Sequence, residues 1–332
     1  MEHVANAVSQ KNVRNEVENY MKKLCCLLTL AFCLFASCKQ KSANQETEGK
    51  VMVLATIFPV YDWAKNVIGE SENVSLDLLL KDGVDMHSYQ PSASDIVKIS
   101  TADIFIYVGG ESDAWVENAL KNAANESTIV INLMDVLKGF VKEELIVEGM
   151  QAEAEDSHGE AEFDEHVWLS LNNAIASSNE IARSLMEKDP DNAQLYMANL
   201  VAYVDRLSDL KNEFDGAFAD KTIIVCDRFP FRYLTDEFGI KYFAAFPGCS
   251  AESEASFDTI AFLSVRLHNL AASEVFVTES ADKKIARTVV SSSGIKNCEI
   301  TVLDSMQSTT FKQAKKGADY LNIMRANLEA LK

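Results

Sequence analysis

The distribution of apolar residues along positions 51–133 predicts strands that alternate with amphipathic helices. Short apolar runs rich in β-branched residues are typical of buried strands, and the segments between them have apolar residues at helical spacing. Pro59 and Gly69 fall near the start and the end of the first helical segment. Ser92 and Asp95 have the spacing of a capping box at the start of the second. The predicted strands are 51–57, 74–80, 103–109 and 127–133, and the predicted helices are 59–69, 92–102 and 112–124.

The same alternation returns in residues 220–332. Strand–helix alternation predicts a parallel sheet with helices packed on its faces. Two such sets therefore predict an α/β protein of two lobes, each a parallel sheet with flanking helices. In the second set the predicted strands are 221–227, 240–246, 273–279 and 299–304, and the predicted helices are 229–239, 256–271, 282–294 and 317–332.

A longer helical pattern lies between the two sets. Residues 174–186 form one amphipathic stretch and residues 189–219 another, in which Pro190 suits the first turn of a helix. We interpret 189–219 as one long rigid helix that links an N-terminal lobe, 51–188, to a C-terminal lobe, 220–332; a core helix within a single domain is the alternative. Its apolar residues near helical spacing are Leu195, Leu200, Val204, Leu207 and Leu210.

The first 37 residues are typical of an extension followed by a lipoprotein signal peptide. Lys22 and Lys23 precede an apolar run, 24–34, that is too short to span a bilayer as a mature helix. The run ends in "LFASC", which resembles a bacterial lipobox and predicts that Cys38 is lipidated. Residues 38–50 would form a polar tether. We expect an exported lipoprotein anchored to the membrane and facing the periplasm or the cell exterior; an ordinary signal peptide or an uncleaved anchor is the alternative.

The formal net charge of −19 argues against nucleic-acid binding, which needs a basic face. A negative surface can instead attract cations. Three cysteines follow the predicted leader: Cys226, Cys249 and Cys298. An odd number cannot pair completely within one chain, and we interpret all three as small buried apolar residues.

Two of the five histidines stand where a loop meets a regular element. His87 lies in "GVDMHSYQP" and His166 in "FDEHVWL", whereas His158 lies in an acidic loop and His268 on an apolar helical segment. In α/β lobes, ligands collect in the loops beyond the carboxyl ends of the strands. Imidazole is the commonest metal ligand, so the pair suggests a metal site, although a single loop histidine is more often merely solvated.

Three predicted strands of the second lobe end in an acidic residue. Asp227 ends 221–227, Glu279 ends 273–279 and Asp304 ends 299–304. A carboxylate in such a place often caps a following helix. The repetition across three strands of one lobe favours metal ligation instead.

Several separated motifs resemble, in the same order, the metal-binding lipoproteins of zinc and manganese ABC importers, the periplasmic solute-binding protein family 9. "ATIFPVYDWAKNVIGE" resembles the opening strand and helix of that family, and "GVDMHSYQP" resembles its G-x-D-x-H-x-Y-x-P region. "HVWL" is similar to its H-x-W-L segment, and "DRFPFRYLTDEFG" to the region after the linking helix. "VLDSMQ" is similar to the Asp-Ser pair near its end. The resemblance covers almost all of residues 51–332.

The resemblance implies that His87, His166 and Asp304 are the first, second and fourth ligands of a divalent metal. Many members of the family have His or Glu at the third ligand position, where this sequence has Arg228. A guanidinium has no lone pair to offer a metal. We therefore predict Asp227 as the third ligand.

Glu279 is the runner-up for that position. Two imidazoles and two carboxylates would balance the charge of a divalent cation. Such a set suits tetrahedral Zn²⁺, and also Mn²⁺ or Fe²⁺, which prefer oxygen donors. The acidic loop with His158 resembles a reduced form of the His-rich loop of zinc-binding members, which favours zinc over manganese; a merely solvated loop is the alternative.

The function that the resemblance implies is capture of a divalent metal and its delivery to an ABC permease by a monomeric binding protein that is not an enzyme. The alternative is a zinc-dependent hydrolase. Catalytic zinc keeps an open coordination position, whereas four protein ligands would close the shell. The sequence has no G-x-S-x-G, H-E-x-x-H or P-loop pattern. An adhesin role is compatible with metal binding, and the sequence does not decide on it.

Overall fold

The computed structural model describes residues 49–121, 123–151, 162–250 and 254–332, which belong to one compact unit. The predicted signal peptide, Cys38, nearly all of the tether 38–50 and His158 lie outside the described residues. In the part of the chain that is described, no helix combines the length and the apolar character needed to cross a membrane.

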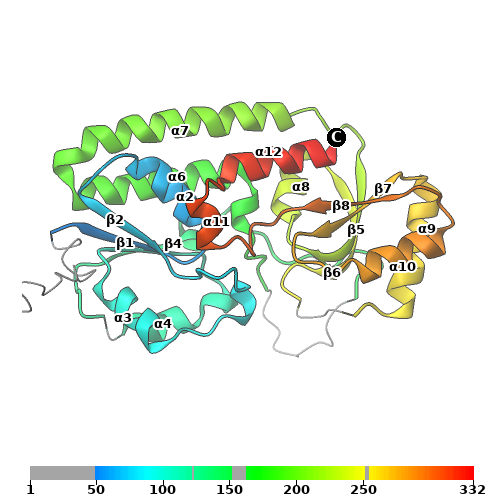
Figure 1. Ribbon diagram of the computed structural model, residues 1–332, viewed down its shortest axis with the longest axis horizontal. Helices are drawn as coiled ribbons and strands as arrows, with labels where there is room; N and C mark the ends of the chain where they lie inside the picture. The colour runs from blue at the N-terminus through cyan, green and yellow to red at the C-terminus, as the bar shows by residue number, and fades with distance from the viewer. Residues whose placement is uncertain (1–48, 122, 152–161, 251–253) are drawn as a thin grey trace, which may run out of the picture. The chain divides into compact units, whose positions relative to one another are not determined.

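Two separate sheets, each of four parallel strands, form the framework (Figure 1). The first sheet has the order β2-β1-β3-β4 and the second the order β6-β5-β7-β8, so both lobes have the same topology. All eight predicted strands are confirmed. Their bounds are β1 Val51–Ala55, β2 Val74–Leu78, β3 Ile104–Tyr107, β4 Ile129–Asn132, β5 Thr222–Phe229, β6 Lys241–Pro247, β7 Glu274–Thr278 and β8 Glu299–Leu303.

Helices cover both sheets, as the alternating pattern predicts. The capping box of α3 is present: the Ser92 side chain accepts from the backbone N–H of Asp95, and the Asp95 side chain accepts from that of Ser92. The short helices α5 and α11 are not among the predicted helices, and α5 begins at Leu133, the last residue of a predicted strand. The bounds are α2 Phe58–Ile68, α3 Ala93–Thr101, α4 Trp115–Leu120, α5 Leu133–Val136, α6 Leu171–Lys188, α7 Ala193–Phe214, α8 Arg232–Phe238, α9 Phe257–Leu270, α10 Lys284–Ser293, α11 Phe311–Lys315 and α12 Tyr320–Leu331.

The long helix α7 connects the two sets of strands, and it also packs along its length on α6, α2 and α12 (Figure 1). Its buried face differs from the predicted one, because Leu195 is exposed and two tyrosines take part in the apolar stripe. The buried residues of α7 are Tyr196, Leu200, Tyr203, Leu207, Leu210 and Phe214. The spacing of three and four is that of a helix with one buried face.

The two lobes are joined by buried contacts as well as by α7. The Trp168 indole N–H donates to the carbonyl of Ser305 in the second lobe (2.8 Å), and the Tyr320 hydroxyl of α12 donates to the carbonyl of Trp168 (2.7 Å). The Trp63 ring of α2 meets the Tyr320 ring edge-on, with 5.4 Å between the centroids. One apolar core continues from the first sheet through α6, α7 and α12 to β5. The interface between the lobes is therefore well packed.

Candidate metal centre

The two predicted imidazoles lie together. His87 occupies the 3₁₀ turn Met86–Ser88 after β2, and His166 caps the 3₁₀ turn Val167–Leu169. Their Nε2 atoms are 3.3 Å apart. Two nitrogen ligands at about 2.0–2.1 Å from one tetrahedral zinc ion would be separated by about 3.3–3.4 Å. The pair therefore already has the spacing that a shared metal ion requires.

The other ring nitrogens are held by hydrogen bonds from outside the pair. His166 Nδ1 is 2.8 Å from Asp164 Oδ1, which also accepts from the His166 backbone N–H at 2.9 Å. His87 Nδ1 is 2.7 Å from the Ser112 hydroxyl. An ionised carboxylate can only accept, so His166 carries its proton on Nδ1 and offers the Nε2 lone pair. Metal-ligating histidines commonly have such a partner on the second nitrogen.

His87 is neutral at physiological pH. Burial, and next the charge of His166, lower its pKa to about 4. A metal ligand must be in the deprotonated form, so this environment prepares His87 for a cation. Glu165 is buried beside it, with Oε2 3.6 Å from His87 Nδ1 and without a hydrogen-bond partner among the described residues.

The predicted carboxylates do not join the imidazole pair. Asp227 lies inside β5, which runs two residues beyond the predicted end with a shift of register after Val225. Its Oδ2 accepts from the backbone N–H (3.1 Å) and the hydroxyl (2.5 Å) of Thr278 on β7. Asp304 follows β8 as predicted, and its Oδ1 accepts from the backbone N–H of Met306 at 2.7 Å. Burial, and next the charge of Glu279, raise the pKa of Asp304 to about 6.

Glu279, the runner-up, is used within the second lobe. It follows β7 as predicted, and its carboxylate accepts from the backbone N–H groups of Ser305 (2.8 Å) and Ser308 (3.2 Å) and from both of their hydroxyls. These bonds hold the loop between β8 and α11. The structure thus gives the three strand-end acids structural partners, and among the described residues the predicted two histidines and two carboxylates do not form a group whose ligand atoms all lie within 4.8 Å of one another.

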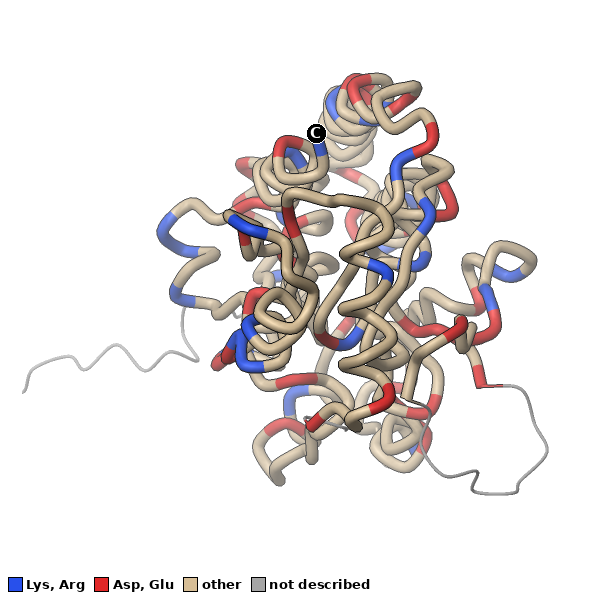
Figure 2. Tube along the Cα trace, turned by 90° about the vertical axis from the view of Figure 1, so that its right-hand side faces the viewer, with Lys and Arg blue, Asp and Glu red and all other residues tan. Residues whose placement is uncertain are grey.

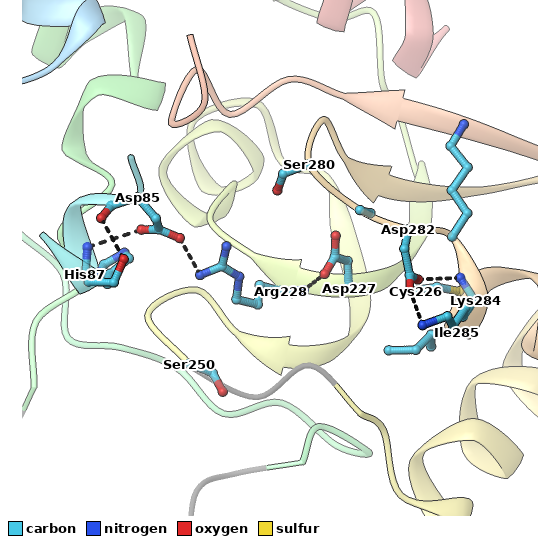
Figure 3. A pocket seen from close by; sticks show the side chains of 13 residues that line it. Asp85, His87, Cys226, Asp227, Arg228, Ser250, Ser280, Asp282, Lys284 and Ile285 are labelled. Atoms are coloured by element: carbon cyan, nitrogen blue, oxygen red, sulfur yellow. Dashed lines mark hydrogen bonds and ion pairs between the residues drawn. The ribbon is translucent and has the colours of Figure 1, made fainter. Parts of the chain in front are cut away.

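Arg228, at the position where the resemblance leads one to expect a ligand, makes an ion pair across the cleft. Its Nη1 is 2.8 Å from Oδ2 of Asp85, and Asp85 Oδ1 accepts from the backbone N–H of His87 at 3.1 Å. Burial alone would raise the pKa of Asp85, but the guanidinium of Arg228 brings it below its ordinary value. Figure 3 shows Arg228 reaching from β5 toward Asp85 and His87 across a cavity of about 500 Å³.

A residue that the sequence reasoning interpreted as merely apolar lies at the imidazole pair. Cys249 follows β6, and its Sγ and one nitrogen each of His87 and His166 all lie within 4.8 Å of one another. In the described part of the chain this is the one such group of three His, Cys, Asp or Glu side chains. Burial, and next the charge of Glu144, raise the pKa of the Cys249 thiol. In the sequence, the only indication that Cys249 could be a ligand is weak: the "PGC" segment follows a predicted strand, and ligands collect in strand-end loops.

An acidic cavity of about 320 Å³ opens beside His87 and Cys249. Its negative lining would concentrate cations at the imidazole pair. Lysines and arginines are interspersed with acidic residues along the traced chain (Figure 2). The cavity is lined by His87, Glu111, Ser112, Glu144, Glu162, Phe163, Glu165 and Cys249.

Comparison with known proteins agrees with a metal-binding arrangement. The model of the family described as zinc-uptake complex component A, periplasmic (ZnuA), matches residues 53–332. The chain is 31% identical over 320 residues to the zinc-binding lipoprotein AdcA of Streptococcus pneumoniae strain R6, an overlap of 94% of this chain and 61% of that protein. It is 30% identical over 319 residues to the high-affinity zinc uptake system protein ZnuA of Bacillus subtilis, an overlap of 92% and 95%.

The chain spans about 61% of the length of the first curated relatives that it matches. Among solved structures, the Zn(II)-bound ZnuA-like domain of Streptococcus pneumoniae AdcA superposes with a TM-score of 0.66 at 28% identity, covering 85% of this chain and 98% of that one. The metal-dependent lipoprotein YcdH of Bacillus subtilis gives 0.68 at 27% identity, with the same coverage of 85% and 98%. These similarities confirm the two-lobe α/β fold.

Proposed function

Because the chain belongs to the family of periplasmic zinc-uptake components A, we propose that it captures a zinc ion between its lobes and delivers it to the membrane permease of an ABC importer. The observation that carries the proposal is the convergence of His87 Nε2 and His166 Nε2 at 3.3 Å. Their outer nitrogens are fixed by Ser112 and Asp164, so the rings hold this geometry before the metal arrives.

The burial of the pair supports a carrier rather than a catalyst. The His166 side chain is fully buried and that of His87 is 13% exposed, so a bound ion would be enclosed by protein. An enclosed ion is protected from exchange, which a carrier needs, whereas a hydrolytic zinc ion must present a water to its substrate. The zinc-binding names of the relatives agree with capture and transport.

Release of the ion would accompany docking on the permease. Docking can favour an open arrangement of the lobes, from which the ion leaves, only if the permease binds that arrangement more tightly than the closed one. The lobes are fastened by Trp168 and Tyr320, so we infer a small tilt or a loop movement rather than a wide hinge opening. The Asp85–Arg228 ion pair spans the cleft and is the contact that such a tilt would break.

The cellular setting belongs to the same proposal. We propose that the chain acts as a monomer outside the cytoplasmic membrane, anchored through a lipid on Cys38, so that the carrier stays close to its permease. Manganese remains the second candidate cargo after zinc.

A transport assay tests the proposal. In a strain of the host that lacks this chain, grown with a zinc chelator, the wild-type chain should restore growth and uptake of radioactive zinc. The double variant His87→Ala/His166→Ala should restore neither. His268→Ala is the matched control, because that ring lies on α9 and bonds the carbonyl of Ser293 in the second lobe.

Uptake by the double variant that equals wild-type uptake would contradict the proposal. So would hydrolysis of an ester or phosphoester by the purified zinc-loaded protein, with turnover that is lost in His87→Ala. The first result would show that uptake does not depend on the imidazole pair, and the second would move the function from transport to catalysis.

A further inference from the structure

We propose that the thiolate of Cys249 is the third protein ligand of the zinc ion, at the place in the shell for which the sequence predicts Asp227. The inference rests on the proposed function, since it names a ligand of the same cargo. It changes the expected donor set from two nitrogens and two oxygens to two nitrogens, one sulfur and one oxygen.

The first support is the grouping of the donor atoms. Cys249 Sγ, His87 and His166 present ligand atoms that lie within 4.8 Å of one another. Zinc bonds to imidazole nitrogen at about 2.0–2.1 Å and to thiolate sulfur at about 2.3 Å, so small side-chain movements bring all three donors onto one ion.

The second support is the way in which the chain places Cys249. A Cβ atom on Gly248 would lie 2.9 Å from the carbonyl oxygen of Phe229 and 3.0–3.1 Å from the Cε1 and Nδ1 atoms of His166. The absence of a side chain at Gly248 therefore lets the backbone run directly against the His166 ring. The backbone N–H of Cys249 then donates to Glu144 Oε1 at 3.0 Å, which fixes the cysteine at the mouth of the acidic cavity.

The third support is that the competing ligands have other partners. The Asp227 carboxylate bridges β5 to Thr278 of β7, and Glu279 holds Ser305 and Ser308. Moving either carboxylate away from these partners onto the metal would leave the backbone N–H groups without their acceptor. A buried donor that loses its acceptor destabilises the folded protein.

The donor set has a consequence for selectivity. On binding, the thiol proton of Cys249 is released to solvent and the thiolate takes its place as a zinc ligand. Thiolate is a soft donor that favours zinc over manganese, which prefers carboxylate and water. Two neutral imidazoles and one thiolate leave one positive charge on the site, which the surrounding glutamates offset.

Cobalt substitution tests the inference directly. Co²⁺ replaces zinc in tetrahedral sites, and a thiolate ligand adds an intense near-ultraviolet charge-transfer absorption. Metal-stripped wild-type protein loaded with Co²⁺ should show this absorption, and Cys249→Ser should lose it while still binding the ion. Cys298→Ser is the matched control and should keep it, because Cys298 lies at the amino end of β8, on the edge opposite the strand-end loops.

Zinc affinity from chelator competition completes the test. Losing an outer-shell partner costs about 10–100-fold in affinity, so losing the Cys249 ligand should cost about 100-fold or more. Absence of the charge-transfer absorption in a wild-type protein that binds zinc tightly would overturn the inference. So would a large loss of zinc affinity in Asp227→Asn with none in Cys249→Ser.

These outcomes separate the inference from the proposed function. If the wild-type protein binds no zinc at all, the proposed function fails, and the ligand assignment fails with it. If zinc binds one to one but Cys249→Ser binds it as tightly as wild type, the transport function stands and only the ligand assignment fails.

Discussion

Asp164 fixes His166 at two points, since one carboxylate oxygen accepts from both its backbone N–H and its Nδ1. This double contact sets the tautomer and the direction of the ring with a single acid. The sequence marks His166 by its place before an apolar helix start, but it assigns no role to the acid two residues earlier. The reason is that "FDEHV" contains two acids, and only the fold tells which of them turns toward the ring.

The Asp164 contact gives a prediction. Asp164→Asn should weaken zinc binding by about 10–100-fold while leaving a stoichiometry of one ion per chain, because an outer partner orients the ligand without binding the metal. Chelator competition measures the change. Asp220→Asn is the control, since that carboxylate is 97% exposed. Unchanged zinc affinity in Asp164→Asn would show that His166 is held by packing alone.

Asp62 shows that a buried carboxyl can also weaken the fold. One of its oxygens accepts from the backbone N–H of Tyr320 (3.0 Å) and from the Asn66 amide (3.2 Å), and the other is buried without a partner among the described residues. Burial raises the pKa of Asp62 from 3.8 to about 6. The folded state therefore holds a proton that the unfolded state has lost, and stability falls as pH rises from about 4 through 6.

Asp62→Asn should remove this dependence. Relative to wild type, its free energy of unfolding should rise with pH over that window, by up to about 3 kcal/mol, since one pKa unit corresponds to about 1.4 kcal/mol. Denaturant unfolding at pH 4, 5, 6 and 7 measures the difference. A difference that stays constant over these pH values would mean that Asp62 is not titrating there.

At the scale of the elements, apolar periodicity predicted the strands well and their ends less well. All eight strands lie where short apolar runs occur, because strands buried in parallel sheets read as continuous apolar segments. β5 runs on through Asp227 to Phe229, beyond the predicted end, because its pairing with β6 resumes at Arg228 after an irregularity. The predicted apolar stripe of α7 was partly wrong, because the rings of Tyr196 and Tyr203 are buried there beside the leucines.

The site was predictable only in part, because its residues lie in loops and their partners are set by the tertiary fold. His87 and His166 stand in polar segments next to apolar runs, which marks them in the sequence. Cys249 is marked only weakly, by its place after β6, because a cysteine in a loop is interpreted as apolar until the fold places it against the His166 ring. The strand-end acids were correctly placed at the ends of β7 and β8, but their hydrogen-bond partners depend on pairings that no local pattern records.

The loop after β6 offers a test at this scale. Gly248→Ala should displace the Cys249 segment from His166, because the added Cβ would meet the ring and the Phe229 carbonyl at about 3 Å. We expect weaker zinc binding with little change in the circular dichroism spectrum, since the strands themselves are not altered. Zinc affinity equal to wild type would show that the loop adjusts without cost and that its position does not matter.

At the scale of the whole molecule, the fold brings together residues that are far apart in the sequence. His87 and His166 come from loops of the first lobe, while Cys249 and Arg228 come from the second. Two contacts between the lobes hold these residues in place: the hydrogen bond from Trp168 to Ser305 and the ion pair between Asp85 and Arg228. A cation bound by His87, His166 and Cys249 would add its own link between the lobes.

A competition titration of Zn²⁺ against Mn²⁺ on metal-stripped full-length protein, with His87→Ala/His166→Ala alongside, is the most direct test of zinc capture by the imidazole pair. We predict one tightly bound zinc ion per chain, no displacement by a large excess of manganese, and loss of tight binding in the double variant. Tight zinc binding that survives the loss of both imidazoles, or no saturable zinc binding by the wild-type protein, would contradict it.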